Sequence, residues 1–180
     1  RFKAEQKRKQ AEVGLVRGLA YTSVGGEILD VEVSVLEGSG KLELTGNLGD
    51  VMKESAEAAI TFVRANAEKY GIDTEFYRTR DIHIHATESA VPKDGPSAGV
   101  TITTALISAL TNRPVRRDIA MTGEVSIRGR VLAIGGLKEK AMAAYREGIK
   151  TVIIPFDNQP NLDDVDKVVK EQVKFVPVKT

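Results

Sequence analysis

A serine framed by glycines is the residue whose type and setting most favour chemistry in this sequence. Residues 95–99 read Gly-Pro-Ser-Ala-Gly and lead into an apolar run. A Gly-x-Ser-x-Gly pattern is typical of the nucleophile elbow of α/β-hydrolases, in which an acid and then a histidine follow the serine. Both histidines here, His83 and His85, precede Ser97, which argues against an esterase of that type. A nucleophilic Ser97 needs another base, and lysine is the remaining choice.

The apolar run after Ser97 predicts a helix and places the serine at or near its N-terminus. Residues 100–110 include two alanines and end before Asn-Arg-Pro at 112–114, which outweighs their β-branched content. A helix N-terminus offers unpaired N–H groups and a positive dipole end, which suit an oxyanion hole. Gly95 lets the backbone approach a substrate closely. The alternative is that Ser97 only caps the helix, a frequent role of serine.

A lysine can act as the base only when its amine is neutral. The pKa of lysine in water is ~10.4, and burial among apolar groups lowers it by several units. Residues 137–144 read Leu-Lys-Glu-Lys-Ala-Met-Ala-Ala, which predicts a helix with an apolar face. Lys138 and Lys140 flank that face on opposite sides, so the spacing does not choose between them. The alternative for either lysine is the usual solvated side chain.

Two histidines and several carboxylates form a second group of candidate residues. His83 and His85 alternate on a predicted strand at 81–86, so their side chains point to one face and could bind a metal ion together. A third ligand is missing at a motif spacing, which favours structural histidines and predicts no metal site. For Asp94 and Glu32, solvent exposure or a structural hydrogen bond is the default interpretation.

Other serine, lysine and glycine motifs do not fit. The Ser-x-x-Lys motif of penicillin-recognising enzymes requires a lysine at position 100, which is valine. The glycines at 135–136 precede a helix, but the spacing of a phosphate-binding loop is absent.

The composition excludes several classes of protein. A chain of 180 residues with 42% hydrophobic residues is expected to form one globular domain. Its 26 basic and 25 acidic side chains give a net charge of +1, which does not indicate a nucleic-acid partner. The absence of cysteine excludes thiol catalysis and disulfides. No apolar stretch approaches the ~20 residues of a membrane span. Basic residues cluster at 1–9, and the chain does not begin with methionine. For these reasons we expect a fragment of a longer protein.

The hydrophobic patterns predict an α+β fold, because strands and helices interleave without a regular βαβ rhythm. A strand-rich block at 15–46 has expected turns at 25–26 and 37–40. The further elements are a helix at 51–70, a strand at 81–86, two strands within 119–134 joined by a turn at 128–129, a helix at 137–147, a strand at 151–154, a helix at 162–171 and a strand around residue 175.

These motifs together resemble the proteolytic domain of Lon protease. The resemblance rests on Pro-Lys-Asp-Gly-Pro-Ser-Ala-Gly at 92–99, Met-Thr-Gly-Glu at 121–124 and Ile-Gly-Gly-Leu-Lys-Glu-Lys at 134–140, and it extends to 45–55. It covers nearly the whole chain, and its serine motif is similar to that of the soluble A-type enzymes. It implies a single α+β domain of mixed sheets and helices, like domain 2 of ribosomal protein S5. Tyr21 departs from the tryptophan that is common at its position.

The resemblance also implies a role for particular residues. Ser97 falls on the nucleophile of the family's Ser-Lys dyad, and Lys140, the second lysine of Gly-Leu-Lys-Glu-Lys, falls on its base. Thr122 would bond to the lysine and orient it. Asp94 would lie in the loop that opens or occludes the site, next to Gly95.

Three further positions match family residues close to the site. His83, His85 and Glu32 would have supporting roles there. No metal is implied.

The activity implied by the resemblance is ATP-linked endopeptidase cleavage of unfolded, damaged or short-lived regulatory proteins, bound as extended strands. No cofactor is expected in this domain, and ATP and Mg would bind an ATPase module that precedes it. Residues 1–10 would join that module to a proteolytic domain at 11–180. We expect the full-length protein to be a homohexamer in the bacterial cytoplasm, or less readily in the mitochondrial matrix. No membrane or nucleic-acid partner is expected, and the excised domain is compatible with a monomer. The rival hypothesis is a non-catalytic interaction module on the same scaffold.

Overall fold

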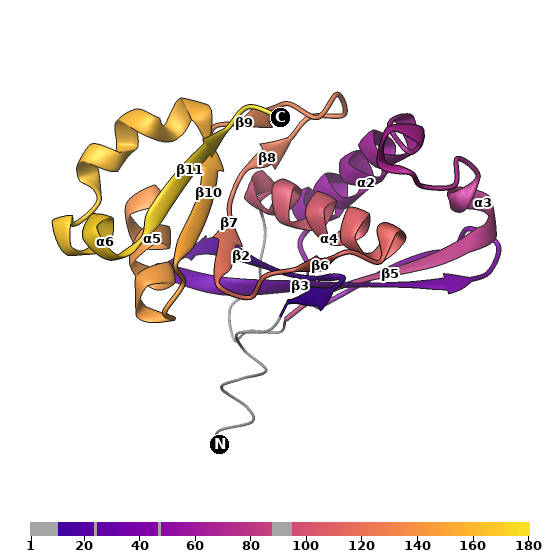
Figure 1. Cartoon of the computed structure of the whole chain (residues 1–180), viewed down its shortest axis with the longest axis horizontal. Helices are drawn as coiled ribbons and strands as arrows, with labels where there is room; N and C mark the ends of the chain where they lie inside the picture. Colours follow the sequence, from indigo (N-terminus) through magenta and orange to yellow (C-terminus); the bar gives the residue numbers. More distant parts are fainter. Residues whose placement is uncertain (1–10, 24, 47, 88–94) are drawn as a thin grey trace, which may run out of the picture.

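A mixed sheet of seven strands organises the computed structural model, which describes residues 11–23, 25–46, 48–87 and 95–180 (Figure 1). Within these residues its strand order is β11-β10-β7-β2-β3-β5-β4, and two small antiparallel sheets pair β1 with β6 and β8 with β9. The strands are β1 Glu12–Val13, β2 Leu15–Thr22, β3 Gly25–Glu37, β4 Leu42–Thr45, β5 Arg80–Ala86, β6 Pro114–Val115, β7 Ile119–Met121, β8 Glu124–Val125, β9 Val131–Leu132, β10 Thr151–Pro155 and β11 Lys174–Val178. Helices and mixed sheets in one domain confirm the predicted α+β class.

Helices cover the sheet in two groups. Figure 1 shows α2 and α4 over β3 and β5, while α5 and α6 lie beside β10 and β11. The α-helices are α2 Asp50–Ala65, α3 Phe76–Thr79, α4 Gly99–Thr111, α5 Leu137–Arg146 and α6 Lys167–Gln172. The 3₁₀ helices are η1 Glu68–Tyr70, η2 Pro96–Ala98 and η3 Phe156–Asp164.

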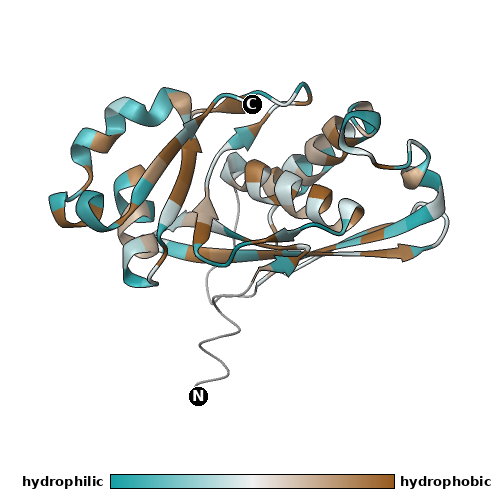
Figure 2. Ribbon diagram, in the orientation of Figure 1, coloured by the Kyte–Doolittle hydropathy of each residue, from teal (hydrophilic) through white to brown (hydrophobic). Residues whose placement is uncertain are grey.

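The larger hydrophobic core lies between the central strands and the pair α2 and α4. Along β3, Leu29, Val31 and Val33 are buried while the alternating residues Glu32 and Ser34 are exposed, as the sequence predicts. Figure 2 shows the same alternation as brown and teal along the ribbon of β3. Residues of α4 belong to the same core, which holds this helix against the sheet.

A second core holds α5 against the other half of the sheet. Leu137, Ala141 and Ala144 of α5 are buried with Val152 and Ile154 of β10. Because these apolar residues recur at helical spacing, one side of α5 is fixed on the strands, and the orientation of its lysines is fixed with it.

The β2–β3 hairpin approaches α5 more closely than a side chain would allow. Thr22, the last residue of β2, pairs with Gly25, the first residue of β3, so the predicted turn at 25–26 is wrong. A Cβ at Gly26 would lie 2.2 Å from the carbonyl oxygen of Glu139. Gly26 therefore allows α5 to pack closely on β3, and it does not form a turn.

Gly26→Ala should destabilise the protein by on the order of 1–3 kcal/mol, because a methyl group would push α5 away from β3. Urea unfolding monitored by circular dichroism measures this change. Ser34→Ala, on the exposed face of the same strand, is the control and should change stability by no more than about 0.5 kcal/mol. A Gly26→Ala protein as stable as the control would contradict the close packing.

Three other predicted elements differ from the structure. The helix predicted at 51–70 ends at Ala65, because Asn66 caps it and a 3₁₀ turn follows. The segment 119–134 contains three strands instead of two, since the chain leaves the main sheet after β7. The helix predicted at 162–171 is divided into η3 and α6, with Val165 between them in extended conformation.

Candidate active site

Ser97 lies in η2, which runs directly into α4, so the prediction of a serine at a helix start is confirmed. Gly123 fixes this turn from both sides: its N–H donates to the Ser97 carbonyl at 2.8 Å, and its own carbonyl accepts from the N–H of Val100 at 2.9 Å. The Ser97 residue itself remains partly exposed.

The two glycines of the motif have separate structural reasons. Gly95 has a φ of 122°, a region that side chains disfavour. A Cβ at Gly99 would lie 2.8 Å from the backbone nitrogen of Val125 in β8. The first glycine therefore sets the direction of the chain entering the turn, and the second lets β8 pack against it.

The structure separates the two lysines that the sequence left equivalent. Lys140 is 2% exposed, whereas Lys138 is exposed on the first turn of α5. Burial lowers the pKa of Lys140 from 10.5 to about 8. Within the described ranges no ion pair involves Lys140. Burial without an ion-pair partner among the described residues increases the fraction of neutral amine near pH 7, and a general base requires that form.

Thr122 is the polar partner of the buried lysine. Lys140 Nζ donates to Thr122 Oγ1 at 3.1 Å, and Thr122 is fully buried. The backbone N–H of Thr122 donates to the carbonyl of Ile153 at 3.1 Å, which places the residue where the chain leaves β7. The side chain is thus held in position to orient the amine.

Thr122→Val should slow the covalent labelling of Ser97 by a small fluorophosphonate roughly ten- to a hundredfold, because the valine keeps the volume but releases the lysine amine from its orientation. The change should also lower the pKa of Lys140 below its present value, since an acceptor that stabilises the ammonium is lost. The rate of this labelling, measured against pH, reports both effects. Thr122→Ser, which retains the hydroxyl, should restore most of the activity. Equal losses in the two variants would contradict the orienting role.

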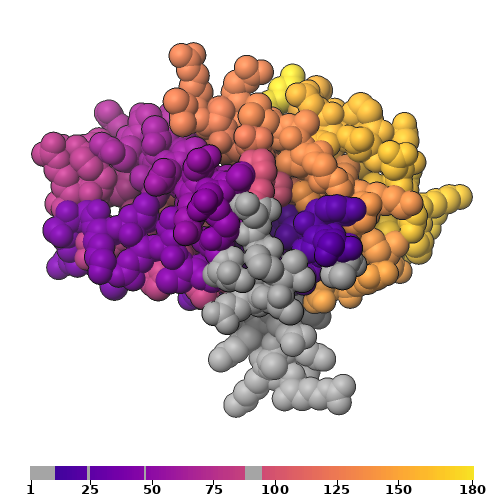
Figure 3. All heavy atoms as spheres, turned by 180° about the vertical axis from the view of Figure 1, so that it is seen from behind, coloured from indigo at the N-terminus to yellow at the C-terminus, as the bar shows by residue number. Residues whose placement is uncertain are grey.

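One cavity of about 640 Å³ brings Ser97 and Lys140 together. Its walls come from segments far apart in the sequence: residues 19–23 at the end of β2, Met52 of α2, and residues 133–136 before α5. From behind, Figure 3 shows the rose-coloured atoms around residue 100 between the purple atoms of α2 and the indigo atoms of the β2–β3 hairpin. The nucleophile candidate is therefore accessible, while the lysine lies at the protected end.

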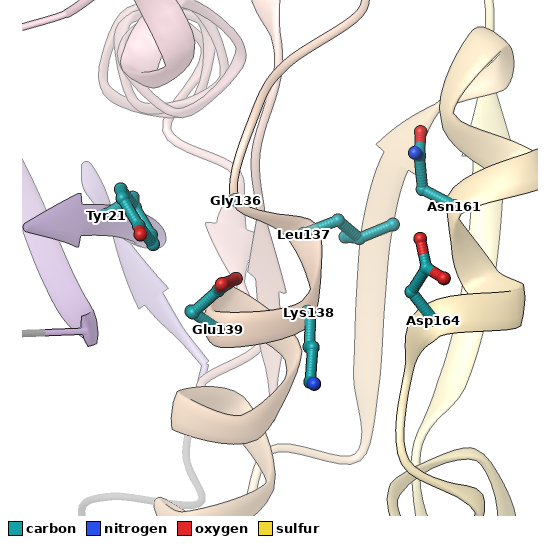
Figure 4. A pocket seen from close by; sticks show the side chains of 7 residues that line it. All are labelled: Tyr21, Gly136, Leu137, Lys138, Glu139, Asn161 and Asp164. Carbon is teal, nitrogen blue, oxygen red and sulfur yellow. The ribbon is translucent and has the colours of Figure 1, made fainter.

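A second pocket, of about 490 Å³, adjoins the first through Tyr21 and Gly136, which line both. Figure 4 shows Asn161 and Asp164 of η3 across this pocket from the first turn of α5. A Cβ at Gly136 would lie 2.7 Å from Cδ2 of Tyr21, so the aromatic ring packs on the glycine between the two pockets. Tyr21 and Gly136 therefore form the wall that separates the second pocket from the cavity of Ser97.

The histidines lie on another face of the sheet. The Thr45 hydroxyl is 2.8 Å from His83 Nε2 and 2.7 Å from His85 Nδ1, so both rings share one face, as predicted. Glu32 pairs with His85 across the strands and is exposed. None of these residues lines the cavity of Ser97. Asp94 lies outside the described residues.

The part of the chain that the structure describes contains no group of three His, Cys, Asp or Glu side chains arranged as metal ligands. Nor does any described helix have the length and apolar character to cross a bilayer.

Sequence reasoning missed two parts of the site. Residues 133–136 line the cavity, and two of them are glycines, so no side-chain motif marks such a role. Asn158 lies buried in η3 and bonds to Ile134 of this segment, and it belongs to none of the elements or motifs predicted from the sequence. Neither could be found without the three-dimensional contacts.

The sequence is similar to those of known proteins over its whole length. Residues 1–180 match the family model described as the Lon protease (S16) C-terminal proteolytic domain. A Lon protease of Clostridium acetobutylicum is 55% identical over 175 residues, which cover 97% of this chain and 22% of the relative. Lon protease of Haemophilus influenzae is 55% identical over 180 residues, covering 100% of this chain and 22% of that protein. Lon protease 1 of Bacillus subtilis is 55% identical over 175 residues, which cover 97% of this chain and 23% of that protein.

This chain spans less than a quarter of the length of those relatives. The family match over residues 1–180 and the identities nevertheless show the family, and the observed α+β fold is consistent with it. The chain belongs to the family of Lon protease C-terminal proteolytic domains.

Proposed function

We propose that this chain hydrolyses peptide bonds with Ser97 as nucleophile and Lys140 as general base. The observation that carries the proposal is the buried Lys140 amine, which has a lowered pKa, forms no ion pair with the described residues and lines the same cavity as Ser97. Lys138, the other candidate of the helix, is exposed.

In the proposed reaction, neutral Lys140 takes the proton from Ser97 Oγ while the oxygen attacks the peptide carbonyl carbon. Backbone N–H groups at the start of η2 stabilise the resulting oxyanion. The Lys140 ammonium then gives its proton to the leaving amine, and the C–N bond breaks. Water hydrolyses the acyl-enzyme, with Lys140 again acting as the base.

We further propose that the domain works within an ATP-dependent protease. Residues 1–10 would join it to an ATPase module that binds ATP and Mg, unfolds protein substrates and passes them on as extended chains. The substrates would be unfolded, damaged or short-lived regulatory proteins in the bacterial cytoplasm, and the assembly a homohexamer. The family membership and the bacterial Lon relatives support this. In that assembly Asp94 would control access to Ser97, and His83, His85 and Glu32 would have supporting roles.

The pH dependence of peptide cleavage tests the chemical step. Because only neutral Lys140 accepts a proton, kcat/KM should rise about tenfold per pH unit below the pKa and level off above about 8. The measurement uses an unstructured fluorogenic peptide under single-turnover conditions, so that chemistry limits the rate. A flat profile across the neutral range would contradict the assignment of Lys140.

A further inference from the structure

Asn158 holds one residue of the cavity wall by both of its backbone groups. Asn158 Oδ1 accepts from the N–H of Ile134 at 2.9 Å, and Nδ2 donates to the Ile134 carbonyl at 2.9 Å. Nδ2 also donates to Asn161 Oδ1 at 2.9 Å. Asn158 is 2% exposed, so these bonds form away from water and leaving them unmade would be costly.

This pair of bonds fixes the local conformation. The N–H and C=O of one residue can reach a single carboxamide only if both point to the same side, as in an extended chain. Asn158 therefore takes the place of a neighbouring strand on one edge of the segment that follows β9. In an extended chain the groups of the residues on either side, Ala133 and Gly135, point to the opposite edge.

That opposite edge faces the candidate site. Ala133 and Gly135 are exposed and line the cavity that Ser97 and Lys140 share. Among the described residues no hydrogen bond engages the backbone of Ala133 or Gly135. A free main-chain edge next to a nucleophile is the arrangement to which an extended peptide adds as a strand.

We propose that Asn158 is a positioning residue for peptide substrates, which it serves by holding Ile134 so that Ala133 and Gly135 present their N–H and C=O groups to the substrate main chain. This inference rests on the proposed peptidase function of the cavity. Asn158 lies 61 positions after Ser97 in the chain. In this role it aligns the substrate without contacting the substrate or the reacting atoms.

The chemistry of the side chain matches this role. A carboxamide supplies the donor and the acceptor that Ile134 requires, whereas a carboxylate supplies acceptors only. Asn158→Asp would place an oxygen against the Ile134 carbonyl, and Asn158→Leu would leave both backbone groups unpaired. Asn161→Ala removes only the third bond and is the matched control.

The experiment compares two reactions of the full-length protein. An extended fluorogenic peptide needs strand pairing, whereas covalent labelling of Ser97 by a small fluorophosphonate does not. For Asn158→Asp and Asn158→Leu, KM for the peptide should rise about tenfold or more through loss of aligned main-chain bonds. The labelling rate should stay within about twofold of wild type, and Asn161→Ala should match wild type in both reactions.

A second variant tests the edge without touching the buried amide. Ala133→Pro removes one N–H from the cavity side. The preceding residue lies in a strand, a conformation that is compatible with a following proline. This variant should also raise the peptide KM. Parallel loss of labelling and cleavage in the Asn158 variants, or an unchanged KM in all three, would overturn the positioning role. Failure of the wild type to be labelled at Ser97 would instead overturn the proposed function.

Discussion

Lys140→Met is expected to abolish peptide cleavage and at the same time to stabilise the protein at neutral pH. The substitution removes the base while retaining an unbranched side chain that suits the buried, apolar surroundings. Burial of the lysine lowers its pKa from 10.5 to about 8. At ~1.4 kcal/mol per pKa unit, the amine costs the folded state about 3 kcal/mol at pH 7. An active-site residue that reduces stability is the expected cost of function.

The pH dependence of this effect has a definite sign. Between about pH 8 and the unfolded value of 10.5, the unfolded lysine holds a proton that the folded lysine has lost. Stability of the wild type therefore rises with pH in this window, whereas Lys140→Met shows no such rise. The stability difference between the two proteins should be greatest below pH 8 and should disappear above about pH 10.5.

Urea unfolding at several pH values, combined with a peptide assay, measures both parts of this prediction. Lys138→Met is the matched control, because that lysine is exposed on the same helix turn and should alter neither quantity. A Lys140→Met protein that is less stable than the wild type at pH 7 would contradict the account of a desolvated amine.

Ser97→Ala should reduce kcat by about a thousandfold or more, since the acyl-enzyme can no longer form. The fold should be unaffected, because the contacts that hold η2 to Gly123 use the backbone of residue 97. Burst-phase and steady-state kinetics with the fluorogenic peptide measure this reduction in kcat. Ser34→Ala, on the exposed face of β3, should retain wild-type activity. Activity retained in Ser97→Ala would show that another residue is the nucleophile.

Much of the site could be predicted because its chemistry is local in sequence. Glycines around Ser97, the missing downstream histidine and the apolar run after it indicated a serine at a helix start that needs an unusual base. Helical spacing alone left Lys138 and Lys140 equivalent. Their difference is burial, which depends on how α5 packs on β3 and β10 and so on contacts with distant strands.

The features that the sequence did not predict depend on long-range contacts. Gly26 reads as a turn residue, yet its lack of a side chain admits the carbonyl of Glu139 from α5. The strand expected around Thr122 is interrupted because Gly123 bonds to Ser97 and Thr122 to β10. Asn158 carries no local signal for its bonds to Ile134. In each case the partner lies more than twenty positions away.

The central claim, that Lys140 activates Ser97, is tested most directly by the rate at which a small fluorophosphonate labels Ser97 as a function of pH. In the wild type this rate should increase with pH to a plateau, with a midpoint near the Lys140 pKa of about 8. In Lys140→Met it should be slow at every pH. Equal rates and equal pH profiles in the two proteins would contradict the dyad.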